Sequence, residues 1–219
     1  MKEEILQTSL KQFLKHGIRE MSIQKLIEPL GISTKTVYKY FKNKEELLED
    51  ALTLYYAQHR EIWKSQAAIH SAVILFFDIW HNGIELEYDV NKVFFEDLHY
   101  YYPELLKKKE AELDKEYTKQ FIQVIYKGIE QGVFQKDINP EIIFMGITVL
   151  YQAIVREGRF ESFHASANEI FSNTIALYIR GLCTEQGIKD LDNHIQTLKV
   201  TSKLKLPARK AAARLHWTI

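Results

Sequence analysis

Cysteine, proline and glycine are scarce in this 219-residue chain. It contains one cysteine, four prolines and nine glycines. A single cysteine excludes a disulfide framework and the paired cysteines of zinc-finger spacings. With so few turn-forming residues and no long alternating pattern, a turn-rich β-sandwich is excluded as well. The sequence therefore predicts a helical protein of a reducing compartment, and we expect it in the cytoplasm.

The sequence also lacks an apolar run long enough to span a bilayer. The longest such run, around residues 144–155, is interrupted by Thr148 and Gln152, whereas a membrane helix needs about 20 apolar residues. Residues 1–13 carry acids among periodic apolar residues, unlike a signal peptide. We therefore expect no membrane partner.

Net charge is absent overall, but the charges are unevenly distributed along the chain. Residues 1–44 hold nine Lys/Arg against four Asp/Glu, a balance of +5, while residues 51–198 hold fourteen against twenty-one, a balance of −7. Residues 199–219 hold six basic residues and no acid. A basic end can approach a polyanion such as DNA while the acidic remainder keeps the protein in solution.

Apolar residues at helical spacing are present almost throughout. Gly17 is suited to end the first helix, and Asn139-Pro140-Glu141 is a strong start signal for a later one. The pattern predicts an all-α fold. We expect helices over residues 5–16, 23–30, 34–41, 44–63, 68–87, 90–101, 103–131, 140–156 and 165–186, the last closing near Gly187.

The segment around Gly31-Ile32-Ser33 has the pattern of a helix-turn-helix. The glycine permits a tight turn, Ile32 fills a small core, and Ser33 caps the following helix. Such a helix fits the major groove of B-DNA, where its side chains meet base edges. No acid lies between Ser33 and Lys44, and the positions expected to be exposed can all donate hydrogen bonds: Thr34, Lys35, Thr36, Tyr38 and Lys39.

Residues 22–48 resemble the DNA-binding signature of the TetR family of bacterial regulators. The matching positions are Phe13 and Gly17 before the segment and Gly31, Ser33, Thr36, Tyr38, Phe41, Lys44, Glu45 and Leu47 within it. Residues 177–188 also resemble the last helix of many members. Ile27, Pro29 and Lys35 depart from the family pattern, and Lys35, where a glycine is common, indicates a different base preference.

The resemblance implies a homodimer that binds a near-palindromic, inverted-repeat operator in double-stranded DNA. It also implies a C-terminal helical domain that binds a small-molecule effector and then releases the DNA. When the family's contacts are transferred to the matching positions, the residues implied to contact bases and the nearby DNA backbone are Ser33, Thr34, Lys35, Thr36, Tyr38 and Lys39. Those implied to contact phosphates are Ser22, Gln24, Tyr40 and Lys44.

The predicted organisation has three parts. A three-helix DNA-binding domain occupies residues 1–47, and a helical ligand-binding and dimerisation domain occupies residues 48–195. Residues 196–219 form a basic tail that is disordered or vector-derived. We expect a repressor of transcription, the alternatives being an activator or adaptor of the same fold and a helical small-molecule-binding enzyme. No nucleophile motif or phosphate-cradling glycine loop favours the enzyme, so a non-enzyme without cofactor is expected.

Aromatic residues are concentrated in residues 68–102. Such a stripe more often builds a core, but ligand pockets are also apolar with a few polar groups. The candidate contacts for an unidentified effector are Phe77, Trp80, Phe95, His99 and Tyr151. Asp78 with His81, and Glu96 with His99, each pair a carboxylate with an imidazole on one helix face; these pairs alone do not make a metal site, and we expect none.

Two broad apolar faces lie at residues 142–154 and 170–182. Two such helices per subunit would form a four-helix interface about a two-fold axis. The predicted interface residues are Ile143, Ile147, Leu150, Ile154, Ile175, Ile179 and Leu182. The alternative is that these faces pack inside one protomer. Cys183 is expected to be a packed thiol, with a redox sensor as the alternative.

Overall fold

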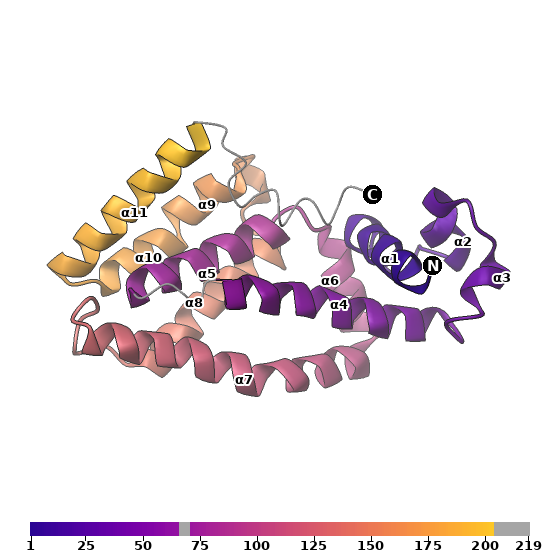
Figure 1. Ribbon diagram of the computed structural model, residues 1–219, viewed down its shortest axis with the longest axis horizontal. Helices are drawn as coiled ribbons and strands as arrows, with labels where there is room; N and C mark the ends of the chain where they lie inside the picture. The colour runs from indigo at the N-terminus through magenta and orange to yellow at the C-terminus, as the bar shows by residue number, and fades with distance from the viewer. Residues whose placement is uncertain (66–70, 204–219) are drawn as a thin grey trace.

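A computed structural model describes residues 1–65 and 71–203 of the chain, which form helices joined by turns and loops (Figure 1). The pairing of Phe134 with Cys183 is an isolated bridge, and the described residues contain no longer strand. None of the described helices combines the length and the hydropathy that crossing a bilayer requires. The elements are α1 (Lys2–His16), α2 (Ile23–Ile27), η1 (Glu28–Leu30), α3 (Thr34–Val37), α4 (Lys44–Ser65), α5 (Ala72–Glu87), α6 (Lys92–Tyr101), α7 (Pro103–Glu130), α8 (Pro140–Val155), η2 (Glu161–Phe163), α9 (Ala167–Asn173), α10 (Ile175–Leu182) and α11 (Glu185–Lys203).

Side-chain caps fix the starts of the N-terminal helices. The Ser22 hydroxyl accepts from the Lys25 amide at 3.3 Å, and the Ser33 hydroxyl accepts from the Thr36 amide at 3.3 Å. Asn43 caps α4 by accepting from the Glu46 amide at 2.8 Å. Each cap satisfies an amide that the helix itself leaves unpaired. The helices α2, α3 and α4 therefore begin where their capping residues predict.

The turn before α3 depends on Gly31. This residue has φ +61°, in the left-handed region where a glycine carries no steric cost. Pro29 lies in η1, so α2 ends at Ile27 and its last turn is a tighter 3-10 turn. The third helix is shorter than predicted: α3 ends at Val37, and the chain continues as turns before Phe41.

Two apolar cores organise the molecule. The first, which we call the head core, joins buried residues of α1, α2, α3 and the start of α4 to residues of α6, including Phe94 and Leu98. The second, the body core, joins residues of α5, α7, α8, α9, α10 and α11. In Figure 1 the short helices α2 and α3 occupy one end of the molecule, and α4 runs from them toward the body alongside α7. The helix α6 thus belongs to the head core although it follows α5 in sequence.

The C-terminal region differs from the prediction. The expected single helix over 165–186 is broken at Thr174 into α9 and α10. Gly187 lies inside α11 and does not end a helix; a Cβ there would stand 2.0 Å from the Val133 carbonyl oxygen, so the glycine permits this close approach. Residues 196–203 belong to α11 and are not a tail, while 204–219 lie outside the described residues, as do residues 68–70 of the helix predicted to start at 68.

Candidate nucleic-acid interface and sensor core

The helix α3 presents its polar side chains outward. Val37 is fully buried and Phe41 nearly so, which anchors the segment to the head core. Tyr38 is 56% exposed and Tyr40 is 40% exposed. Lys35 and Lys39 are exposed as well, and Thr34 and Thr36 are half-buried. Because Figure 1 places α3 at the tip of the molecule, this face is open to a large partner.

The start of α2 adds two further polar groups. Ser22 and Gln24 are exposed, as is Ser33 at the start of α3. The Ser33 hydroxyl also lies 3.1 Å from the Thr36 hydroxyl. A serine hydroxyl that accepts an amide proton keeps its own proton for donation. The caps of α2 and α3 are therefore compatible with the phosphate and backbone contacts predicted for these serines.

Lys44 is placed differently from its prediction. Its ammonium nitrogen donates to the carbonyl oxygens of Ile18 at 2.6 Å and Arg19 at 3.2 Å. Burial lowers the pKa of Lys44, while the negative charges of Asp97 and Glu20 oppose that shift. The Lys44 side chain thus binds the backbone of the α1–α2 loop. This geometry does not support the predicted phosphate contact.

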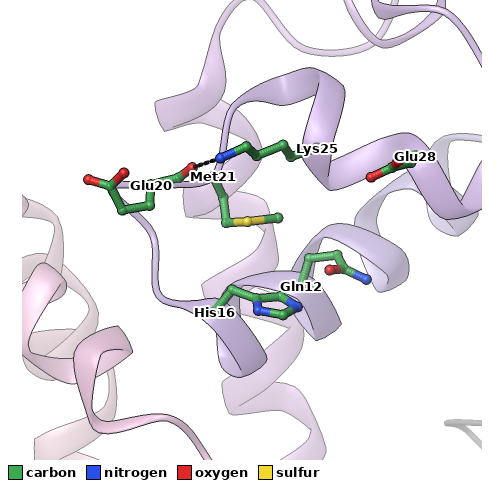
Figure 2. A pocket seen from close by; sticks show the side chains of 6 residues that line it. All are labelled: Gln12, His16, Glu20, Met21, Lys25 and Glu28. Atoms are coloured by element: carbon green, nitrogen blue, oxygen red, sulfur yellow. Dashed lines mark hydrogen bonds between the residues drawn. The ribbon is translucent and has the colours of Figure 1, made fainter.

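A shallow hollow of about 440 Å³ lies on the side of the head (Figure 2). It is lined by the end of α1, the α1–α2 loop, α2 and η1, through Gln12, His16, Glu20, Met21, Lys25 and Glu28. The Lys25 ammonium donates to the Glu20 carbonyl oxygen at 3.1 Å across its rim. None of the predicted effector contacts lines this hollow.

The predicted effector contacts do not form a single site. Phe77, Trp80 and Tyr151 lie in or against the body core, with the rings of Trp80 and Tyr151 5.4 Å apart. Phe95 instead packs against the head core, and the Arg156 guanidinium lies 5.6 Å from its ring. His99 is exposed on α6. Three of the five predicted contacts therefore lie in or against the body core, whereas Phe95 and His99 lie elsewhere.

A buried acid, Glu87, forms a polar centre that the sequence reasoning missed. Glu87 is 3% exposed at the end of α5. Its carboxylate accepts from the Tyr55 hydroxyl of α4 and, at 2.8 Å, from the Tyr151 hydroxyl of α8. Tyr55 belongs to the head core and Tyr151 packs against the body core, so Glu87 joins the two.

Charge and burial act together at this centre. Burial and the Glu87 charge raise the pKa of both Tyr55 and Tyr151 well above the ordinary value, so both phenols stay protonated and donate. Burial lowers the pKa of the Arg156 guanidinium, but Glu87 and, to a smaller extent, Tyr56, Tyr55 and Tyr151 together outweigh that effect, so the net pKa is raised. The carboxylate thus has one cation and two phenols as partners.

We expect Glu87→Gln to lower the free energy of unfolding by about 3 kcal/mol, because removing one partner leaves a buried charge uncompensated. Urea unfolding followed by circular dichroism measures this. Glu85→Gln, an exposed acid on the same helix, is the matched control and should change stability by less than about 0.5 kcal/mol. Equal effects of the two substitutions would show that Glu87 has no special role.

The predicted dimer residues face mostly inward. Ile147, Ile154, Ile175, Ile179 and Leu182 are all buried in the body core of one protomer, and Ile143 and Leu150 are half-buried against it. The exposed residues of the same helices are different ones: Ile142 at 67%, Met145 at 62% and Val149 at 56% on α8, and Leu177 at 58% on α10. Both faces of α8 are apolar, so periodicity alone did not distinguish the inner face from the outer one.

In the first of the two carboxylate–imidazole pairs, Asp78 and His81 each have a partner on another helix. Asp78 lies 2.6 Å from the His194 ring nitrogen of α11, which joins α11 to α5. The His81 ring nitrogen lies 3.3 Å from the Asn168 side-chain oxygen of α9. Glu96 and His99 are both exposed. Across the described part of the chain, no three His, Cys, Asp or Glu side chains gather as metal ligands would.

Cys183 is buried next to the bridge with Phe134. Burial raises the pKa of its thiol to about 11, although the Arg180 charge opposes the shift. Because the thiolate is the reactive form, we expect alkylation at pH 8 to be on the order of a hundredfold slower in the folded protein than in urea. Cys183 is the one cysteine of the chain, so total thiol labelling reports it directly. Rapid labelling of the folded protein would instead favour a redox role.

Comparisons with known proteins agree on one class. The family described as "Bacterial regulatory proteins, tetR family" matches residues 5–51. The chain is 21% identical over 189 residues to the HTH-type transcriptional repressor KstR2 of Mycobacterium tuberculosis, covering 84% of this chain and 94% of that protein. A TetR transcription regulator from Haloarcula marismortui has a similar structure, with a TM-score of 0.67 and 19% sequence identity. The match covers 84% of this chain and 98% of that protein. The structure of a transcriptional regulator from Saccharomonospora viridis in complex with choline is also similar, with a TM-score of 0.66 and 14% sequence identity. The match covers 84% of this chain and 98% of that protein.

Proposed function

We propose that the chain is a regulator of the TetR family, whose model matches residues 5–51, and that it acts in the cytoplasm as a homodimeric repressor that a small molecule releases from an inverted-repeat operator. The carrying observation is the outward face of α3. Its side chains can donate hydrogen bonds, and the basic balance of residues 1–44 attracts the phosphate backbone. The relative that is named a transcriptional repressor supports repression over activation.

The proposed contacts follow from exposure. Thr34, Lys35 and Thr36 meet base edges, Tyr38 and Lys39 meet bases and backbone, and the backbone is also met by Ser22, Gln24, Ser33 and Tyr40. Lys44 is omitted because its nitrogen is used inside the head. We assign DNA binding to residues 1–47 and effector binding and dimerisation to residues 48–195.

Dimerisation is assigned to the exposed apolar residues of α8 and α10. Ile142, Met145 and Val149 recur at helical spacing along α8, and Leu177 adds to them from α10. The two helices pack closely, since a Cβ at Gly146 would stand 2.8 Å from the Tyr178 hydroxyl. A two-fold axis through this face would set the two copies of α3 at a fixed separation.

We assign the effector-binding site to the aromatic region of the body core around Trp80 and Tyr151. Trp80 is 6% exposed, and its indole nitrogen has no hydrogen-bond partner among the residues that the structure describes. A related fold with choline bound supports a small-molecule ligand of this class of protein. An effector weakens DNA binding only if it binds better to a conformation with the wrong head spacing.

The experiment is a gel-shift measurement with genomic fragments selected by the purified protein. We expect binding to an inverted repeat, with log affinity falling linearly as log salt rises, at a slope of about −0.9 for each phosphate contacted. Absent or salt-independent binding would refute the proposal. A reporter assay with and without the protein distinguishes repression from activation, and a substrate screen tests for an enzymatic activity.

A further inference from the structure

We propose that Asp97 of α6 is a positioning residue that sets the orientation of the helix-turn-helix, acting through the backbone of the α1–α2 loop. The inference rests on the proposed function, since it concerns how the two recognition helices are held for DNA. Asp97 is 6% exposed and lies 78 residues after the loop it contacts.

The loop is held from both sides at the same two residues. One carboxylate oxygen of Asp97 accepts from the backbone amides of Ile18 at 2.6 Å and Arg19 at 2.7 Å. The carbonyl oxygens of the same two residues accept from the Lys44 ammonium of α4. Four charge-assisted hydrogen bonds thus fix the segment that connects α1 to α2. Such bonds are short and directional.

Additional contacts bring α6 close to this loop. Asn91 donates from its side chain to the Lys15 carbonyl oxygen at 3.1 Å and from its backbone amide to the Leu14 carbonyl oxygen at 2.9 Å. Gly17 has φ +80°, and a Cβ there would stand 2.7 Å from a Val93 methyl group. At the far end of α6, the Arg19 guanidinium donates to the Tyr101 hydroxyl at 2.5 Å.

The apolar packing of α6 and the hydrogen bonds to Asp97 have different consequences. Phe94 and Leu98 are buried in the head core and hold α6 against the head. That burial is non-directional, so it stabilises association without fixing an angle. The hydrogen bonds fix the path by which the chain leaves α1 for α2 and α3. Loss of Asp97 should therefore leave the head folded but less strictly oriented.

The same helix also contacts the body. Phe95 lies beneath the Arg156 guanidinium, which belongs to the Glu87 centre, and the Lys92 ammonium donates to the Tyr88 carbonyl oxygen at 3.1 Å. A displacement of α6 relative to the body would therefore reach the loop through Asp97. This places Asp97 between the sensor and the recognition helix.

The test compares Asp97→Asn with Glu96→Gln, which removes an exposed acid from the neighbouring position of α6. Two readouts are used on the full chain: amide hydrogen exchange by NMR, and affinity for the selected operator with zero or one base pair inserted at its centre. For wild type and Glu96→Gln we expect slow exchange at Ile18 and Arg19 and at least a tenfold loss of affinity on insertion. For Asp97→Asn we expect exchange at these amides to accelerate at least tenfold and the insertion penalty to fall below threefold, with half-site base preference unchanged.

Lys44→Met removes the two hydrogen bonds to the carbonyl oxygens of Ile18 and Arg19. It should also accelerate exchange at the two amides and lower the insertion penalty. If Asp97→Asn does not fold, Lys44→Met replaces it in the test. An unchanged insertion penalty together with slow exchange in the folded variants would overturn the inference. The exchange measurement needs no DNA. If the wild-type protein binds no operator, the proposed function fails, while fast or slow exchange still decides whether Asp97 fixes the loop.

Discussion

Val149→Glu is expected to convert the proposed dimer into monomers and to lower operator affinity at least a hundredfold. Val149 is 56% exposed on α8, in line with Ile142 and Met145 at helical spacing. A glutamate there would bring two like charges together across a two-fold axis and bury them without partners, at a cost of several kcal/mol. A monomer would also lose the coupling of two half-sites, which is worth about 10²–10⁴ in affinity.

Size-exclusion chromatography with light scattering measures the first effect, and gel shift on the selected operator measures the second. Leu198→Glu is the matched control, because Leu198 is an exposed apolar residue of a different helix, α11. It should leave mass and affinity unchanged. If the Val149 variant stays dimeric with wild-type affinity, the dimer uses another surface.

Tyr38→Ala is expected to lower operator affinity by about ten- to a hundredfold while leaving the melting temperature unchanged. Because Tyr38 is 56% exposed, its ring contributes little to the head core. A direct contact to a base or phosphate is worth about 1–3 kcal/mol, which gives this range. The buried neighbours Val37 and Phe41 keep the segment folded.

The matched control for this substitution is Tyr100→Ala, another exposed tyrosine, on α6. It should bind operator like the wild type. Thermal unfolding followed by circular dichroism, run beside the gel shifts, separates lost contact from lost structure. A variant with normal affinity would remove Tyr38 from the interface, and one that melts early would make it a core residue.

The local features of the head were predictable because their causes are close in sequence. Ser22, Ser33 and Asn43 each cap a helix through an amide three residues later. Gly31 supplies a left-handed turn between the two short helices. Together with the buried Val37 and Phe41, these signals specify the helix-turn-helix and leave the polar side chains of α3 outside. The family resemblance over residues 22–48 drew on three of these positions, Gly31, Ser33 and Phe41.

The long-range features were not predictable from local pattern. Asp97 and Glu87 take partners from helices far away in sequence, so their hydrogen bonds leave no local spacing signal. A weaker signal was present, since Asp97 lies between Phe94 and Leu98 on the apolar face of α6. For α8 the failure was of another kind: Ile147 and Val149 are equally apolar, and only the packed structure distinguishes core from surface. The 165–186 prediction failed because Gly187 indicated a helix end, whereas its small size serves packing inside α11.

A hydroxyl-radical footprint of the wild-type protein on its selected operator tests most directly whether two copies of α3 read DNA together. We expect two protected half-sites with inverted sequences, whose centres are separated by about one duplex turn or a whole number of turns. Protection should disappear in Tyr38→Ala at the protein concentration that saturates the wild type. A single protected block without symmetry, or protection that survives the loss of Tyr38, would contradict this arrangement.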